Sequence, residues 1–145
     1  MQAVEMLKSK LTGSFISRFS VGDTCGLYIG GYWLVAQEVI SEDEDFLNKF
    51  FESNYSHFET TVDKNYISKC AIVAAAMRRE IINVELDELY NLKIMFDNNL
   101  KILFSTNTEV VDWQWCLNTT GADPYTNYIV ACFWEGEIQI NEKQD

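Results

Sequence analysis

The chain has 145 residues, of which 22 are Asp or Glu and 11 are Lys or Arg, so its formal net charge is −11. Hydrophobic residues make up 48% and aromatic residues 14% of the sequence, which supplies a core for a folded domain and excludes general disorder. The acidic balance argues against partners that need clustered Lys and Arg, namely DNA, RNA and anionic membranes.

No linker, repeat or low-complexity block divides the sequence, so we expect a single domain over residues 1–145. Residues 1–11 predict a short helix with Val4, Leu7 and Leu11 on one face. This segment is unlike a secretory signal, because Glu5 and two lysines interrupt it. The longest apolar run, residues 71–77, is far shorter than the roughly 20 residues of a membrane span. We therefore expect a cytoplasmic protein.

The segment from Ser14 to Val39 has the aromatic and β-branched composition of β-strands. Gly30 and Gly31 separate two such runs, residues 26–29 and residues 32–35. Because glycine adopts positive φ without steric cost, this pair predicts a tight hairpin turn.

Two helices are expected next. Ser41-Glu42-Asp43-Glu44 has the form of a capping box, in which the Ser41 hydroxyl accepts from the Glu44 amide and the Glu44 carboxylate reaches back. Apolar residues at helical spacing then predict an amphipathic helix from Phe46 to about Phe58. The second helix is expected to begin near Asp63 and to end near Arg78-Arg79. The side chains expected on its buried face are Tyr66, Ile67, Cys70, Val73, Ala74 and Met77.

The rest of the chain consists of short apolar runs that predict β-strands. Asp97-Asn98-Asn99 lies between two of them and favours a hairpin turn, since Asn and Asp tolerate the left-handed region. The predicted strands cover residues 82–86, 92–96, 100–104, 111–117, 128–134 and 137–140. The expected fold class is α+β: a curved antiparallel β-sheet of hairpins and meanders, with two main helices packed against it.

The sequence offers little for catalysis or metal binding. His57 is the only histidine, no Gly-x-Ser-x-Gly motif is present, and no ligand pair has the short spacing of a zinc site. The acid clusters fit helix starts and turns and lack the pattern of a calcium loop. We therefore expect no enzymatic activity, no metal and no cofactor, although a Cys–His pair that includes His57 stays open.

Cysteines and tryptophans are expected in the core. Trp113 and Trp115 are two residues apart, which places both on one face of a strand; an exposed aromatic binding stripe is the alternative. The cysteines form no C-x-x-C pair and lie in apolar stretches, which favours free thiols that pack as small apolar side chains. They are Cys25, Cys70, Cys116 and Cys132.

Charge is distributed unevenly along the chain. From Ile102 to Glu142 there is no Lys or Arg, and residues 38–59 hold seven acids and a single base, Lys49. A field of one sign destabilises the fold by self-repulsion, but it orients and speeds the approach of a basic protein. Solubility is the alternative explanation for these acids.

Four segments, together with the expected architecture and charge, carry a family resemblance. They are Val21-Gly22-Asp23, Gly30-Gly31-Tyr32-Trp33, the hairpin around Asp97-Asn98-Asn99, and Asp112-Trp113-Gln114-Trp115. A small acidic α+β domain with these segments and no catalytic constellation resembles the immunity proteins of bacterial polymorphic toxin systems, most of all those of contact-dependent growth inhibition.

The resemblance implies a protein that binds one cognate toxin domain, commonly a basic nuclease, and occludes its active site or its nucleic-acid groove. In such a complex the acids stand in for phosphates. The candidate contact residues form two acid-rich sets, Glu42, Asp43, Glu44 and Asp45 on one side, and Glu109, Asp112, Asp123, Glu135 and Glu137 on the other.

Two alternatives from other functional classes stay open. One is a small-molecule-binding or enzymatic domain, whose pocket would be lined by Tyr28, Tyr32, Trp33, Trp113 and Trp115. The other is a subunit of a homo-oligomeric structure that pairs through an exposed strand edge.

Overall fold

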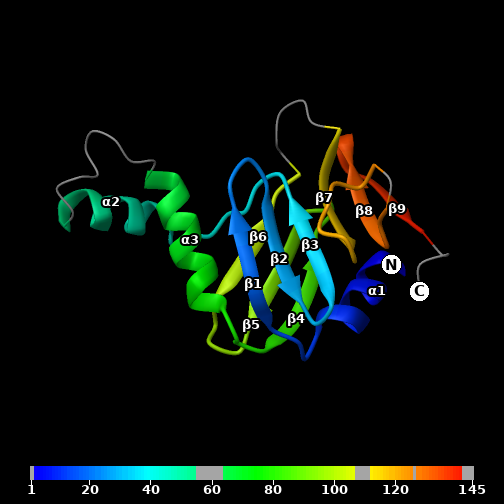
Figure 1. Ribbon diagram of the computed structural model, residues 1–145, viewed down its shortest axis with the longest axis horizontal. Helices are drawn as coiled ribbons and strands as arrows, with labels where there is room; N and C mark the ends of the chain where they lie inside the picture. Colours follow the sequence, from blue (N-terminus) through cyan, green and yellow to red (C-terminus); the bar gives the residue numbers. More distant parts are fainter. Residues whose placement is uncertain (1, 55–63, 107–111, 126, 142–145) are drawn as a thin grey trace.

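The structure, a computed structural model, describes residues 2–54, 64–106, 112–125 and 127–141 (Figure 1). Three α-helices lie within these residues: α1 (Gln2–Leu11), α2 (Glu44–Asn54) and α3 (Lys64–Ala76). A short 3₁₀ helix, η1, covers Trp134–Gly136. The strands are β1 (Ile16–Val21), β2 (Cys25–Ile29), β3 (Tyr32–Ala36), β4 (Ile81–Leu86), β5 (Leu92–Phe96), β6 (Lys101–Phe104), β7 (Trp113–Asn118), β8 (Val130–Phe133) and β9 (Glu137–Ile140).

The strands pair in two antiparallel sheets, which confirms the predicted α+β class. The larger sheet has the order β1-β2-β3-β7-β8-β9, and the smaller has the order β4-β5-β6. Gly30 and Gly31 form the predicted turn between β2 and β3, both with positive φ. Residues 97–99 lie between β5 and β6, as the sequence indicated. The sequence did not indicate that β4, β5 and β6 form a sheet of their own while β7 returns to pair with β3.

Backbone hydrogen bonds join the two sheets at two corners. At one corner the Ile81 amide donates to the Ser14 carbonyl at 2.8 Å, and the Gly13 amide donates to the Ile81 carbonyl at 2.8 Å. At the other, Ile40 and Leu103 exchange both of their backbone hydrogen bonds, at 2.8 and 2.9 Å. These corners hold the smaller sheet across the inner face of the larger one. The space between the two sheets becomes the core.

The core is filled by apolar side chains from the facing sheets, and α1 closes one side of it against β4, β8 and β9. Ala3, Leu7 and Leu11 are the buried residues of α1, which confirms the predicted helix; Val4, expected on that face, is half-buried. Burying each large apolar side chain contributes about 1.5–3 kcal/mol to folding. The largest fully buried side chains include Trp115, Phe96, Phe104, Ile16, Leu27, Ile29 and Leu34.

Helix α2 projects from the body of the molecule, at the left of Figure 1. It packs against α3, and none of its residues is buried. The predicted apolar stripe is present, but Phe46 is 69% exposed and Phe50 is also exposed. Leu47 is half-buried and is the residue of this helix that packs against the core. The predicted continuation through Phe58 lies outside the described residues.

Helix α3 packs against β1 and α2, and its orientation differs from the prediction. Val73 is buried as expected, together with Ser68, Ile72 and Ala76, whereas Tyr66 and Ala74 are exposed. The buried face of α3 therefore runs through positions 68, 72, 73 and 76 and does not include Tyr66. The expected cap at Asp63 lies outside the described residues. No helix within the described residues has the length and apolar character needed to cross a membrane.

The start of α2 corrects one detail of the predicted capping box. The Ser41 hydroxyl accepts from the Asp43 amide at 3.3 Å, two residues along the chain, and not from the Glu44 amide. The Glu44 amide instead donates to the Ser41 carbonyl, while its carboxylate reaches back to the Ser41 amide at 3.5 Å, as predicted. Glu44 also forms an ion pair with Lys69 of α3 at 2.7 Å, which fastens the first turn of α2 to its neighbour.

Candidate functional site

Strand β7 is buried on both of its faces. Trp115 lies in the core between the sheets, whereas Trp113 lies in a separate cluster with Val35, Cys116 and Ala131. The two tryptophans are therefore buried, as predicted, but the prediction that they share one strand face was wrong. The reason is an irregularity in the pairing with β8 between these two residues, which breaks the period-two alternation of the strand.

The outer face of β7 is covered by the chain between β7 and β8. The buried Asn118 side chain holds this connection, donating to the Ala122 carbonyl at 2.7 Å and accepting from the Gly121 amide at 2.9 Å. Gly121 has a φ of +78°, and a Cβ there would lie 3.2 Å from the Trp33 ring, so only glycine fits without strain. The anchored connection presents Asp123 and Tyr125 at the surface.

Asp112 ties this connection to the end of β8. Its carboxylate accepts a hydrogen bond from the Tyr125 hydroxyl at 2.6 Å, and its backbone carbonyl accepts from the Trp134 amide at 2.9 Å. The hydrogen bond to Asp112, together with the negative charges of Asp112 and Asp123, raises the pKa of Tyr125. Tyr125 and Trp134 are nevertheless largely exposed, at 61% and 54%.

The turn between β4 and β5 lies beside η1. A Cβ at Gly136 would lie 3.0 Å from the Tyr90 ring and 3.7 Å from the Leu89 carbonyl oxygen, so the two segments are in close contact. Tyr90 has a φ of +62°, and its carbonyl accepts from the Trp115 indole at 3.0 Å. The adjacent Leu89 is 62% exposed.

Asp87 fixes the conformation of that turn. Its carboxylate accepts from the Leu89 amide at 2.8 Å, the Asn91 amide at 3.0 Å and the Asn91 side chain at 2.8 Å. Desolvation acts to raise the pKa of Asp87, but the hydrogen bonds from Asn91 and Leu89 outweigh it and hold the pKa below its ordinary value. The exposed Leu89 is thus held by an ordered turn.

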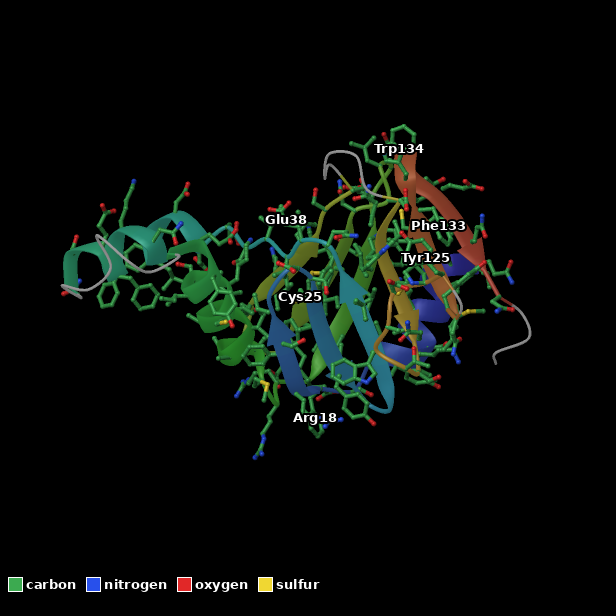
Figure 2. All side chains as sticks on the ribbon, turned by 45° about the horizontal axis from the view of Figure 1, so that its top comes forward. Arg18, Cys25, Glu38, Tyr125, Phe133 and Trp134 are labelled. Carbon is green, nitrogen blue, oxygen red and sulfur yellow. The ribbon has the colours of Figure 1, made fainter. Side chains whose placement is uncertain are left out.

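Leu89, Asp112, Tyr125 and Trp134 together form the surface that we call the aromatic–acidic rim. Figure 2 shows Trp134 and Phe133 near one end of the molecule, with Tyr125 on the same side. Exposed Trp and Tyr side chains are among the residue types that dominate protein–protein binding, and the neighbouring carboxylates add charge complementarity to a basic partner.

The structure separates the two acid-rich sets predicted from the sequence. Asp112 belongs to the rim and Asp123 lies close enough to affect Tyr125 electrostatically. Glu137 begins β9 and accepts from the Gln139 side chain at 3.1 Å. Glu109, and the side chain of Glu135, lie outside the described part of the chain.

The other set lies at the far end of the long axis, before and within α2 (Figure 1). Glu42, Asp43 and Asp45 are exposed there, while Glu44 is occupied by its ion pair with Lys69. The two sets therefore form separate surfaces and do not combine into one.

Three members of the rim were not identified from the sequence, namely Leu89, Tyr125 and Trp134. A signal was available for Tyr125, which stands among turn residues after Pro124, and for Trp134, which lies two residues before Gly136. Large aromatic residues next to turn formers are frequently exposed, because turns lie at the surface.

Three of the four thiols are poorly suited to nucleophilic chemistry. Burial raises the pKa values of Cys25, Cys116 and Cys132 to about 12 each, so these groups stay protonated at neutral pH. All four cysteines are free, and the prediction of core positions is confirmed for these three, whereas Cys70 is half-buried. His57 lies outside the described residues, and within them no group of three potential metal ligands occurs.

The five aromatic residues predicted for a small-molecule pocket do not gather around one cavity. Trp115 is in the core and Trp113 in the outer cluster, while Tyr28 and Trp33 contact each other on neighbouring strands with ring centroids 5.0 Å apart. Of the five, Tyr28 lines a surface hollow near the turn between β2 and β3.

The chain matches no protein-family model, and it has no match among the curated proteins or the solved structures that were compared with it. What the molecule presents is an α+β domain with an ordered, acidic and aromatic surface at one end, and its function has to be argued from that surface.

Proposed function

We propose that this protein binds and neutralises a basic protein, in the way that an immunity protein neutralises its cognate toxin domain, and that the aromatic–acidic rim makes the contact. One observation carries the proposal: Asp112 bonds two exposed aromatic residues, through its carboxylate to the Tyr125 hydroxyl and through its carbonyl to the Trp134 amide. These three residues lie in the stretch from Ile102 to Glu142, which contains no Lys or Arg.

The rim combines the two contributions that a tight complex needs. Tyr125 and Trp134 expose apolar surface that a partner can cover, and truncation of such anchors costs about 2 kcal/mol or more of binding free energy. Asp112 and Asp123 supply the charge complementarity that speeds encounter and excludes acidic partners.

A nuclease domain is the partner class that fits best. Its nucleic-acid groove is lined with Lys and Arg, and carboxylates on a rigid surface can occupy the positions of phosphates. The net charge of −11 gives this protein the opposite sign over most of its surface. Binding in the groove blocks access to the substrate without any chemistry by the inhibitor.

The proposal is tested by affinity purification of the tagged full chain from cells of its source organism, with Trp134→Ala/Tyr125→Ala as the matched variant. We expect one basic protein to be retained by the natural chain and lost with the variant. The gene for that protein should arrest growth when expressed alone, and co-expression of this chain should restore growth.

Two results would contradict the proposal. One is a retained protein that is not toxic, or whose toxicity this chain does not relieve. The other is full protection by the rim variant, which would leave neutralisation in place but move the contact away from the rim.

A further inference from the structure

The N-terminal part of the chain differs in charge from the rest. Residues 1–37 contain two acids and three bases, a formal charge of +1, so the remaining residues carry −12. Two of these bases, Lys10 and Arg18, flank the region of the β2–β3 hairpin. Figure 2 shows Arg18 at the end of the molecule opposite Trp134.

Arg18 rests on aromatic rings. Its guanidinium carbon lies 4.8 Å from the ring centroid of Tyr28 and 5.6 Å from that of Trp33. By contrast, Lys69, Arg79 and Lys93 each have a carboxylate within 4.0 Å. Within the part of the chain that the structure describes, no carboxylate pairs with Arg18. In a protein with twice as many acids as bases, such an arginine has its N–H donors open to an external acceptor.

The rings beneath Arg18 are held in position. A Cβ added to Gly26 would lie 3.5 Å from the Trp33 ring, and one added to Gly121 would lie 3.2 Å from it, so backbone contacts this ring from two segments. Tyr28 and Trp33 are paired directly across β2 and β3. Arg18, opposite Tyr28 on β1, therefore stacks on a rigid support.

A hollow of about 230 Å³ lies beside this stack, and Tyr28 belongs to both. Its lining includes the hydroxyl-bearing Ser14 and Ser17 and the ring of Phe15, which is exposed. Gly30 and Gly31 also line the hollow, and both have positive φ. They form the turn that follows the Ile29–Tyr32 pair of β2 and β3. Backbone amides in such turns form concave sites for anions. An irregularity in the pairing of β1 at Ser17 lies directly beside Arg18.

We propose that the Arg18 stack and the adjoining hollow bind a phosphate monoester carried on a ring, of the size of a sugar phosphate or a mononucleotide. The guanidinium and the glycine turn take the phosphate oxygens, Ser14 and Ser17 bond the hydroxyls of the ring, and Phe15 covers its apolar face. A planar guanidinium suits phosphate because it donates two parallel hydrogen bonds to one group.

Titration calorimetry with the full chain tests this assignment, with adenosine monophosphate, glucose 6-phosphate, inorganic phosphate and benzoate as separate probes. We expect at least one of the two esters to bind, and to bind more tightly than inorganic phosphate. Arg18→Gln should weaken that ester about tenfold or more, because it removes the charge-assisted hydrogen bonds. Arg18→Lys keeps the charge but cannot donate two parallel hydrogen bonds to one group. Its affinity for the ester should therefore lie between those of the natural chain and of Arg18→Gln.

Matched controls separate this site from general charge effects and from the rim. Lys93→Gln removes the same charge on β5, where Lys93 pairs with Glu85 across the smaller sheet, and should leave ester binding unchanged. Trp134→Ala should also leave it unchanged, so failure of the proposed partner contact and failure of this site are distinguishable. Thermal unfolding of each variant checks that it is folded.

Three outcomes would overturn the assignment. They are no ester binding by the natural chain, whether or not benzoate binds; equal binding of inorganic phosphate; and an Arg18→Gln variant that binds as well as the natural chain. Which ester binds more tightly identifies the ring, since adenosine monophosphate adds a base that can stack on Phe15.

Discussion

At the scale of single residues, the Gln114 side chain has an unusual environment. Its carboxamide is buried, and neither its nitrogen nor its oxygen has a hydrogen-bond partner within the described residues. The backbone carbonyl of Gln114 does have a partner, since it accepts a hydrogen bond from the Gln37 amide at 2.9 Å. Burying a polar group without a partner costs about 1–3 kcal/mol.

We therefore expect Gln114→Met, which keeps the length of the side chain and removes both polar atoms, to raise the free energy of unfolding by about 1–3 kcal/mol. Urea denaturation followed by tryptophan fluorescence measures the change. Gln139→Met is the control, because Gln139 is exposed and bonded to Tyr128 and Glu137, and we expect no gain there. A loss of stability in Gln114→Met would show that the amide has partners in solution.

The hydrogen bond between Tyr125 and Asp112 predicts a pH effect at one residue. Because the bond and the nearby carboxylates raise the pKa of Tyr125 above its ordinary value of 10.0, the folded state holds this proton more tightly than the unfolded state. The stabilising contribution is fully present below that ordinary value and is lost as the pH rises through the raised pKa.

Asp112→Asn should move the pKa of Tyr125 back toward its ordinary value. Absorbance titration of the phenolate measures the shift, and Tyr125→Phe identifies which part of the signal belongs to this residue among the seven tyrosines. An unchanged titration in Asp112→Asn would mean that the hydrogen bond does not form in solution.

At the scale of elements, turns whose conformation depends on a few neighbouring residues were predicted correctly from the sequence. The Gly30-Gly31 turn and the β5–β6 hairpin follow from φ preferences within a few residues, and both were correctly predicted. The division into two sheets depends on the pairing of β7 with β3, and the bonds that join the sheets link Ser14 with Ile81 and Ile40 with Leu103. All of these partners are far apart in sequence. Periodicity carries no information about such pairings.

The candidate site was likewise only partly predicted from the sequence. Sequence identified Asp112 and Asp123 from the charge distribution, as part of one of two acid-rich sets. It gave no means of telling how far this set lies from the acids before and within α2, which are at the other end of the molecule in Figure 1. Leu89 joins the rim only because the β4–β5 turn contacts Gly136. The strand irregularity that separates Trp113 from Trp115 has no sequence signature either.

Helix α2 shows that an apolar stripe does not reveal what covers it. We expect Phe46→Ala to change the free energy of unfolding by less than about 0.5 kcal/mol, because that side chain is mostly in solvent. Leu47→Ala should cost about 1–2 kcal/mol, because Leu47 packs against the core. Urea denaturation of both variants checks this order, and a larger loss for Phe46→Ala would show that a surface of the same chain or a second copy covers it.

At the scale of the whole molecule, charge differs between the N-terminal quarter of the chain and the rest. The rim and the acids around α2 belong to a part of the chain with a charge of −12, and residues 1–37 carry +1. Such an asymmetry orients a basic partner during approach, and it opposes association of two copies through their acidic surfaces. Of the two acidic surfaces, the rim is the one that we expect to face the basic partner during approach.

The association rate with the basic protein recovered by affinity purification tests the central claim most directly, when measured between about 0.02 M and about 0.5 M salt. Asp112→Asn/Asp123→Asn and Asp43→Asn/Asp45→Asn remove the same charge from the rim and from the α2 region. We predict that the rim variant associates about three- to tenfold more slowly at low salt and has a flatter salt dependence, while the α2 variant behaves as the natural chain does. Equal effects of the two variants, or a larger effect of the α2 variant, would contradict the assignment of the contact to the rim.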